Sequence, residues 1–183
     1  MSALHAPAPA GAAPANEAAV AAAAHAIRRL GRHELPAVER HLLSLGPADR
    51  RKRFLSPFDD GAIARYVGRM DAGRAVLVGA AGGPDGQLAG IAEAHPVADA
   101  SRTVEVAVSV HPYHRREGLG RRLAAEAVAR AFAEGANAAV FLFAPENRAI
   151  ARLAASLGAR ITGLGRAVLL AEAPPAAALK QAA

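Results

Sequence analysis

The chain has 183 residues, a length that fits one domain with its own hydrophobic core. It contains no cysteine, which excludes disulfides, thiolate metal sites and cysteine nucleophiles and agrees with a reducing cytoplasm, and no apolar run approaches the roughly 20 residues that span a bilayer. The formal net charge of +6 comes from 20 arginines and two lysines, so it suits an anionic ligand, a nucleic acid or an acidic protein surface.

The two ends of the chain differ in composition from the middle. Residues 1–24 are mostly Ala, Pro and Gly, which bury too little surface to offset the entropy of ordering, so we expect a disordered tail there. The first arginine is Arg28, whereas a mitochondrial presequence would be rich in arginine, so no targeting segment is expected. The sequence predicts one folded domain over 25–173 and a short tail over 174–183.

The first half of the domain alternates strand and helix patterns. Residues 26–30 form a strand candidate, and 34–45 carry leucine and valine at helical spacing before a Gly-Pro stop. The basic segment 50–53 reads as a linker with a solvated face. A second helix is predicted from Asp59 or Asp60, which can cap it.

The second half continues with strands and two longer helices. Residues 75–80 and 88–95 predict a hairpin across a turn-rich connector, and 103–110 alternates valine with smaller or polar residues as a half-buried strand does. The remaining patterns predict a long amphipathic helix over 118–134, a strand over 138–143, a helix over 147–157 and two short strands flanking 163–165. Together they predict an α/β (α+β) fold with a mixed, mostly antiparallel sheet of six to seven strands and four helices.

The most informative segment is 108–123, where a strand turns through a basic, glycine-containing loop into a helix. Unpaired N–H groups at a helix start attract anions, and Gly118 and Gly120 allow backbone to approach a ligand closely. A dinucleotide-binding turn would need a third glycine where Leu123 stands, and a P-loop would need Gly-Lys followed by Ser or Thr. The alternative is an ordinary strand-to-helix turn with surface arginines.

This segment resembles the GNAT (Gcn5-related N-acetyltransferase) superfamily of acyl-CoA transferases. Arg115, Gly118 and Gly120 match the pyrophosphate signature of that family, which is Arg or Gln, two residues, Gly, one residue, and Gly or Ala. Glu146-Asn147 and Leu157-Gly158 follow at the distance usual in the family. The resemblance covers about residues 26–170 and implies a GNAT-like domain of bacterial type whose fourth and fifth strands splay apart.

The resemblance also implies roles for individual residues, with acetyl-CoA as the acyl donor. The backbone of Val108 and Val110 would pair with the pantetheine arm, residues 115–121 would hold the pyrophosphate, and Asn147 would contact the donor from the next helix. The expected donor-binding residues are Val108, Ser109, Val110, Arg115, Arg116, Glu117, Gly118, Leu119, Gly120, Arg121 and Asn147.

Transfer to an amine needs a base near the thioester. Glu105 is our first candidate, because family members often have a glutamate on this strand, and the alternative is a solvent-facing glutamate without a role. Glu93 or an ordered water is the reserve. The tyrosine that in many relatives protonates the leaving thiolate is replaced by Ala154, so we expect water to act there. Of the two tyrosines present, Tyr66 is expected on a helix away from the thioester and Tyr113 in the donor loop.

Other residues carry weaker signals. His111 and His114 are three positions apart without an evident acidic partner, so no metal site is expected. Ser109 lacks the glycine-flanked elbow of a hydrolase nucleophile. The stretch from Leu43 to Phe54 resembles the corresponding segment of bacterial protein lysine acetyltransferases and points to a protein substrate.

The leading function is therefore an N-acyltransferase that uses acetyl-CoA and an amine acceptor, either a small molecule or a protein lysine. A catalytically silent acyl-CoA sensor is the alternative. Nucleic-acid binding is disfavoured, because two tyrosines and no tryptophan leave few platforms for base stacking. No membrane partner is expected, and a homodimer is left open.

Overall fold

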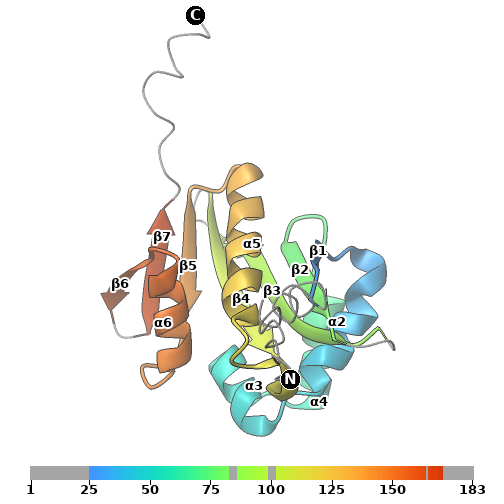
Figure 1. Cartoon of the computed structure of the whole chain (residues 1–183). Coiled ribbons are helices and arrows are strands. Elements are labelled where there is room, and N and C mark those ends of the chain that lie inside the picture. The colour runs from blue at the N-terminus through green and yellow to red at the C-terminus, as the bar shows by residue number, and fades with distance from the viewer. Residues whose placement is uncertain (1–24, 83–85, 99–101, 164, 171–183) are drawn as a thin grey trace, which may run out of the picture.

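The computed structural model of the chain describes residues 25–82, 86–98, 102–163 and 165–170 (Figure 1). The expected tails over 1–24 and 174–183 lie outside the described residues, as does the middle of the β2–β3 turn. The strands are β1 Ile27–Arg29, β2 Val76–Ala81, β3 Leu88–Pro96, β4 Thr103–Val110, β5 Ala138–Leu142, β6 Arg160–Gly163 and β7 Arg166–Leu170. The helices are α2 Leu35–Leu43, α3 Pro47–Phe54, α4 Asp60–Gly68, α5 Leu119–Ala133 and α6 Arg148–Ser156, with 3₁₀ turns η1 at Arg32–Glu34 and η2 at Pro112–His114.

The seven strands form one mixed sheet in the order β1-β2-β3-β4-β5-β7-β6. Every neighbouring pair is antiparallel except β4 and β5, which run parallel. This confirms the predicted mixed, mostly antiparallel sheet. The crossover between the two parallel strands is made by α5, as a parallel connection requires.

The described part of the chain contains five α-helices, one more than the sequence predicted. The additional helix is α3, which occupies the segment expected to be a linker. Pro47 starts it, Asp49 lies in its first turn, and basic residues complement the helix dipole in its last turn. No residue of α3 is fully buried, so the segment has no apolar stripe to reveal it. None of the helices in the described ranges is long and apolar enough to cross a bilayer.

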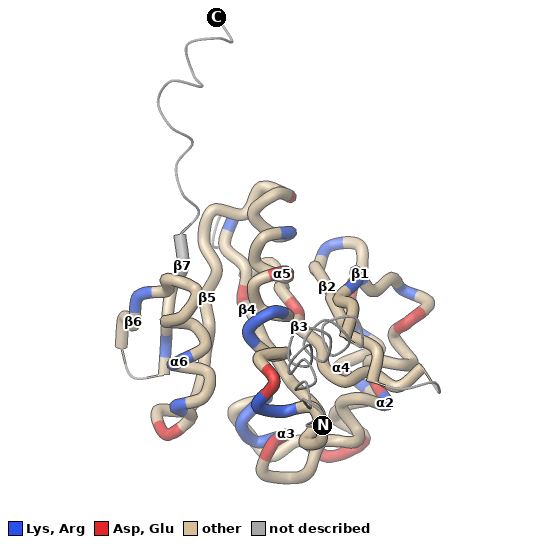
Figure 2. Tube along the Cα trace, viewed as in Figure 1, with Lys and Arg blue, Asp and Glu red and all other residues tan. Residues whose placement is uncertain are grey.

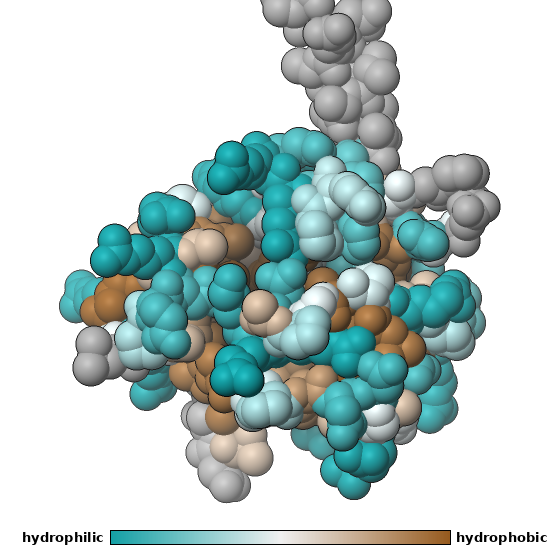
Figure 3. Space-filling model, turned by 90° about the horizontal axis from the view of Figure 1, so that it is seen from below, coloured by the Kyte–Doolittle hydropathy of each residue, from teal (hydrophilic) through white to brown (hydrophobic). Residues whose placement is uncertain are grey.

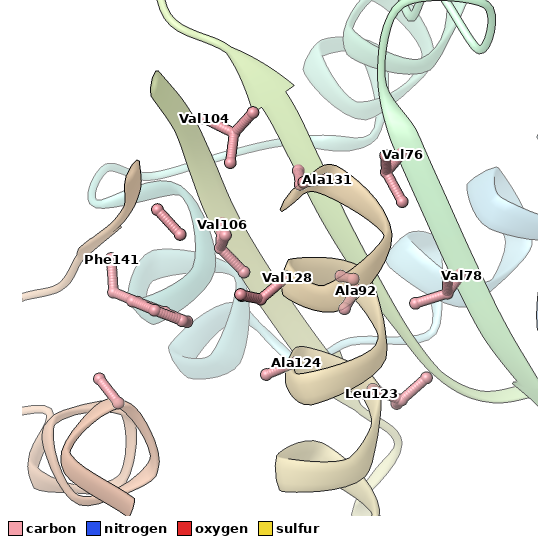
Figure 4. Packing of buried hydrophobic residues seen from close by; sticks show 14 of the residues in the cluster. Val76, Val78, Ala92, Val104, Val106, Leu123, Ala124, Val128, Ala131 and Phe141 are labelled. Carbon is pink, nitrogen blue, oxygen red and sulfur yellow. The ribbon is translucent and has the colours of Figure 1, made fainter. Parts of the chain in front are cut away.

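One face of the sheet is covered by α5 and α6 (Figure 1). Leucine, valine and alanine side chains of α5 pack on the valines and alanines of β2, β3 and β4, and Phe141 joins them from β5 (Figure 4). Leu123 is fully buried at the centre of this contact. A Cβ atom built on Gly90 of β3 would lie 2.8 Å from Leu123 Cδ1, so helix and strand are in close contact here.

The opposite face is covered by α2 and α4, whose aliphatic side chains pack on β2 and β3. Arg50 joins α3 to this layer, because its guanidinium donates hydrogen bonds to the carbonyls of Leu43 and Leu45 at 2.7 and 2.8 Å and contacts Asp60 at 2.6 Å. The helix α3 also contacts β4 of the sheet.

The parallel contact between β4 and β5 is short. Only Thr103, Val104 and Glu105 of β4 pair with β5, opposite Ala138, Ala139 and Val140. The rest of β4 continues to Val110 without a partner on this side among the described residues, while β5 pairs with β7 over its whole length on its other edge. The predicted splay between the fourth and fifth strands is thus present.

The buried contact of Leu123 gives a test of the core. We expect Leu123→Ala to lower the free energy of unfolding by about 2–5 kcal/mol, because it removes packed methyl groups and leaves a cavity. Ile161→Ala is the control, since this side chain is 48% exposed and its loss should change stability by less than about 1 kcal/mol. Urea unfolding of both variants measures the difference, and equal losses would contradict the packing described.

Candidate active site

A groove of about 690 Å³ lies where β4 leaves β5, between α3, the loop before α5 and the first turns of α6. Figure 3 shows the molecule from this side, where hydrophilic residues cover most of the face and hydrophobic surface shows between them. Lysine and arginine gather along α3 and around the start of α5 (Figure 2). Among the predicted donor-binding residues, the groove is lined by Val108, Ser109, Val110, Arg115, Arg116, Gly118, Leu119, Gly120, Arg121 and Asn147.

One end of the groove is the N-terminus of α5. Gly118 is the N-cap in the left-handed conformation, with φ of 73°, and it provides no side-chain cap. The first N–H groups of the helix therefore have no intrahelical partner and carry the positive end of the helix dipole. A Cβ atom on Gly120 would lie 3.5 Å from Val110 and Leu153, so this residue lies at the groove wall. The arrangement suits an anion with several oxygens.

The edge of β4 that faces the groove has free backbone positions. His111 N donates to Ala89 O at 2.8 Å, so in the antiparallel pairing with β3 the odd-numbered residues of β4 bond to β3. The N–H and C=O groups of Val108 and Val110 therefore point toward β5, which pairs with β4 only as far as Glu105, and of these four groups the Val110 carbonyl is occupied by Arg115. A ligand with amide groups can pair with this edge as an added strand.

The arginines of the loop have different surroundings. Arg115 Nε donates to Val110 O at 3.0 Å, and Nη2 forms an ion pair with Asp49 of α3 at 2.7 Å. Arg115 thus joins the end of β4 to α3 across the groove. Arg116 and Arg121 are both exposed beside the helix start and belong to the groove lining.

Two residues of the predicted loop are placed differently from the others. The side chain of Leu119 is buried in the core, so only its backbone N–H is available to a ligand. Glu117 is exposed and is not part of the groove lining. Its carboxylate lies within 4.8 Å of ring nitrogens of His25 and His114, which are 3.2 Å from each other. The sequence offered no evident acidic partner for His114, whereas here Glu117 and His25 lie beside it, and the three side chains are close enough together to hold a metal ion.

The side chain of Ser109 is held by a hydrogen bond to His41 of α2. Its hydroxyl lies 2.9 Å from Nε2 of His41, and Nδ1 of His41 lies 2.9 Å from Leu88 O. Burial lowers the pKa of His41 to about 4, so the ring is neutral, donates from Nδ1 and accepts the hydroxyl hydrogen at Nε2. A neutral histidine with so low a pKa is a weak base, and Ser109 is a strand residue rather than an activated nucleophile.

A smaller cavity of about 170 Å³ continues from the groove into the wedge between β4 and β5, and we call it the wedge cavity. Glu105, Tyr66, Ala107 and Phe141 are among its lining residues, and it shares Lys52, Arg53, Val108 and Ile150 with the groove. Glu105 is exposed within it. Tyr66 lies on a helix, α4, as expected, and it also lines the wedge cavity, whereas Tyr113 is 86% exposed and Ala154 is buried in the core.

The model of the acetyltransferase (GNAT) family matches residues 44–159, which is more than half of the chain. The chain belongs to this family. No curated protein sequence matches it.

Solved structures of the same fold are numerous. The GNAT domain of PAT from S. lividans superimposes with a TM-score of 0.66 at 17% identity, covering 80% of this chain and 90% of that one. A phosphinothricin acetyltransferase from Sinorhizobium meliloti in complex with acetyl-CoA gives 0.62 at 18%, covering 79% and 86%. Spermidine N-acetyltransferase from Vibrio cholerae with CoA and spermine gives 0.61 at 18%, covering 81% and 96%. At these identities the likeness shows the fold.

This GNAT chain also has a buried charged cluster that sequence reasoning missed. Glu93 of β3 is 1% exposed, and its Oε1 lies 2.8 Å from Nη2 of Arg53, whose side chain is 8% exposed. Its Oε2 accepts hydrogen bonds from the hydroxyl of Tyr66 and from Nε2 of His95, the latter at 2.9 Å. Arg53 also donates to the Tyr66 hydroxyl at 3.1 Å. The prediction of a solvated face over 50–53 is therefore wrong for Arg53.

The cluster sets the protonation of its members. Burial alone would raise the pKa of Glu93, but the charge of Arg53 and the hydrogen bonds from His95 and Tyr66 outweigh it and lower the pKa to about 2. Burial and the Glu93 charge raise the pKa of Tyr66 above its usual value. Glu93 is therefore ionised and Tyr66 protonated at neutral pH. A buried carboxylate with a pKa of about 2, held by an ion pair to Arg53 and hydrogen bonds from Tyr66 and His95, is a poor general base, so the reserve candidate Glu93 is disfavoured for that role.

The cluster was missed because its residues come from three separate elements, with Arg53 of α3 13 positions from Tyr66 of α4 and Tyr66 27 positions from Glu93 of β3. One signal was available: Glu93 lies within an otherwise apolar strand, and a charge at a core position needs a partner. Three groove residues, Lys52, Ile150 and Leu153, were also not predicted. The segment of Lys52 was expected to be a linker, and Ile150 and Leu153 were interpreted as core residues of the helix α6.

We expect Arg53→Met to lower the free energy of unfolding by about 3–5 kcal/mol, because it leaves Glu93 as an uncompensated buried charge. In the double variant Arg53→Met with Glu93→Gln, part of the loss should be recovered. Arg29→Met is the control, since Arg29 and Glu134 form an exposed ion pair whose loss costs no more than about 1 kcal/mol. Urea unfolding at pH 7 measures all three, and equal losses for Arg53→Met and Arg29→Met would disprove the role of the pair.

Proposed function

We propose that the chain is an N-acyltransferase that moves an acetyl or other short acyl group from acyl-CoA to an amine. The observation that carries this proposal is a single continuous groove. It begins at the unpaired N–H groups of α5, follows the open edge of β4 and ends in the wedge cavity beside the carboxylate of Glu105. The acetyl-CoA and CoA complexes among the neighbouring structures support the same donor.

The groove offers a contact for each part of such a donor. The N–H groups of the first turn of α5, with Arg116 and Arg121 beside them, suit a pyrophosphate. The backbone of Val108 and Val110 suits the amides of the pantetheine arm. Asn147 is 8% exposed at the N-cap of α6 and makes no side-chain cap bond, so its amide is available on the groove wall. We assign donor binding to these residues.

In the transfer, the amine nitrogen forms a bond to the acyl carbon, the carbon–sulfur bond breaks, and the thiolate of CoA takes up a proton. The amine must first lose its own proton, and we assign this step to Glu105. Its carboxylate lies in the wedge cavity and takes part in none of the hydrogen bonds or ion pairs found among the described residues. We assign the proton of the leaving thiolate to water, because the raised pKa of Tyr66 weakens it as an acid and its hydroxyl donates to Glu93.

The first test concerns donor binding. We expect Gly120→Trp to abolish acetyl-CoA binding in calorimetry, because the indole would fill the groove beside the N–H groups of α5. Gly120→Ala is the matched control: its Cβ meets neighbours at the ordinary distance of 3.5 Å, so it should fold and bind within a few fold of wild type. Wild-type affinity in the Trp variant would overturn the assignment of the groove to the donor.

The second test concerns the base. We expect Glu105→Gln to lower kcat by about 100-fold or more while acetyl-CoA affinity stays close to wild type, because the amide keeps the shape of the side chain but cannot accept the proton. Glu39→Gln on α2 is the control, since Glu39 lines neither the groove nor the wedge cavity. Thiol release and calorimetry measure the two quantities. An unchanged kcat would move the role to an ordered water.

A further inference from the structure

A third cavity of about 620 Å³ lies between α4 and the end of β3, and we call it the arginine cavity. Its volume is in the range of 300–1,000 Å³ that is typical of small-molecule sites. Tyr66 and His95 belong to its lining, and Phe58, Met70 and Val97 give it apolar walls. The cavity is large enough for a ligand of amino-acid to dipeptide size.

The charge of this cavity is strongly positive. Arg65 and Arg69 come from successive turns of α4, and Arg74 comes from the loop before β2. Among the described residues of the lining, Asp71 is the one that is acidic, and its Oδ1 accepts a hydrogen bond from Gly73 N at 2.9 Å. Within the described ranges, none of the three arginines takes part in an ion pair or a side-chain hydrogen bond. Guanidinium groups without a protein partner bind carboxylate or phosphate oxygens in paired hydrogen bonds.

The arginine cavity and the wedge cavity meet at Tyr66, which lines both. His95, at the floor of the arginine cavity, lies directly opposite Glu105 in the pairing of β3 with β4. Paired residues of antiparallel strands lie on the same face of the sheet, so a ligand can extend from the three arginines to Glu105. A molecule with an anionic group at one end and an amine at the other has the matching charge distribution.

We propose that the acceptor is a small amine that carries a carboxylate, as an amino acid or short peptide does, and that Arg65, Arg69 and Arg74 bind its anionic group. The assignment rests on the proposed N-acyltransferase function and names the acceptor class for it. Polyamines and other purely cationic amines are disfavoured, because the three arginines repel them. The ionised Glu93 beneath Tyr66 and His95 is neutralised by Arg53 and does not reverse this preference.

The test compares acceptors that differ only in charge. Thiol release from acetyl-CoA is measured with free amino acids with apolar and acidic side chains, with the corresponding amino-acid amides, and with spermidine. We expect kcat/KM to be at least about tenfold higher for the acids than for their amides. In the double variant Arg65→Glu with Arg69→Glu, this preference should disappear through a higher KM for the acids, with little change for the amides. Arg40→Glu on α2 carries the same type of charge change outside the three cavities and should keep the preference.

A second measurement does not depend on turnover. Calorimetry with N-acetylated amino acids and with their amides should show binding of the acids that is lost in the Arg65→Glu, Arg69→Glu variant. Equal turnover of acids and amides, preferred turnover of spermidine, or no binding of any acid would each overturn the acceptor assignment while leaving acyl transfer intact. Failure of the wild-type chain to bind acetyl-CoA would instead overturn the proposed function itself.

Discussion

The incomplete pairing of β4 with β5 is the constraint on which the rest of the site depends. A parallel pair that continued to Val110 would use the backbone groups of β4 for the sheet and close the groove. Because the pairing stops at Glu105, the N–H and C=O groups of Val108 and the N–H of Val110 remain on an open edge, and the wedge beneath them has room for a cavity. The helix α5, which connects the two strands, then begins at the far end of that same edge. Donor groove, wedge cavity and helix N-terminus are thus three results of one topological feature.

The buried cluster around Glu93 connects the helices α3 and α4 to the sheet. The helix α3 buries none of its residues fully, and Arg53 attaches it to Glu93 of β3, the same carboxylate that accepts a hydrogen bond from Tyr66 of α4. A buried ion pair is weak evidence for net stability, since taking both charges out of water is costly. Its directional bonds do fix where α3 and α4 lie. Tyr66, which lines both the wedge cavity and the arginine cavity, is held in place by this cluster.

Much of the fold could be predicted from local patterns. The alternation of valine over 103–110 marked β4 with the bounds that the structure has, and the apolar stripe after Gly118 marked α5 to within one residue at each end. The donor loop was found because its glycines and arginines are consecutive in the chain. The helix α3 was missed because it buries no stripe of its own, and the Glu93 cluster and the arginine cavity were missed because their residues meet only after three separate elements pack together. Patterns within one element can be read from the sequence, whereas contacts between elements depend on the packing.

The neutral His41 behind Ser109 bears on how rate measurements at low pH are interpreted. Its folded pKa of about 4 lies below the ordinary value of 6.5, so the stabilisation that it provides as a neutral acceptor is complete above about pH 6.5 and is lost progressively as the pH falls toward 4. Ordinary carboxylates titrate in the lower part of the same interval. Part of any loss of activity on acidification would therefore reflect unfolding around β4 rather than protonation of a base. An acid limb in a pH–rate profile can be assigned to Glu105 only after the fraction of folded protein has been measured at each pH.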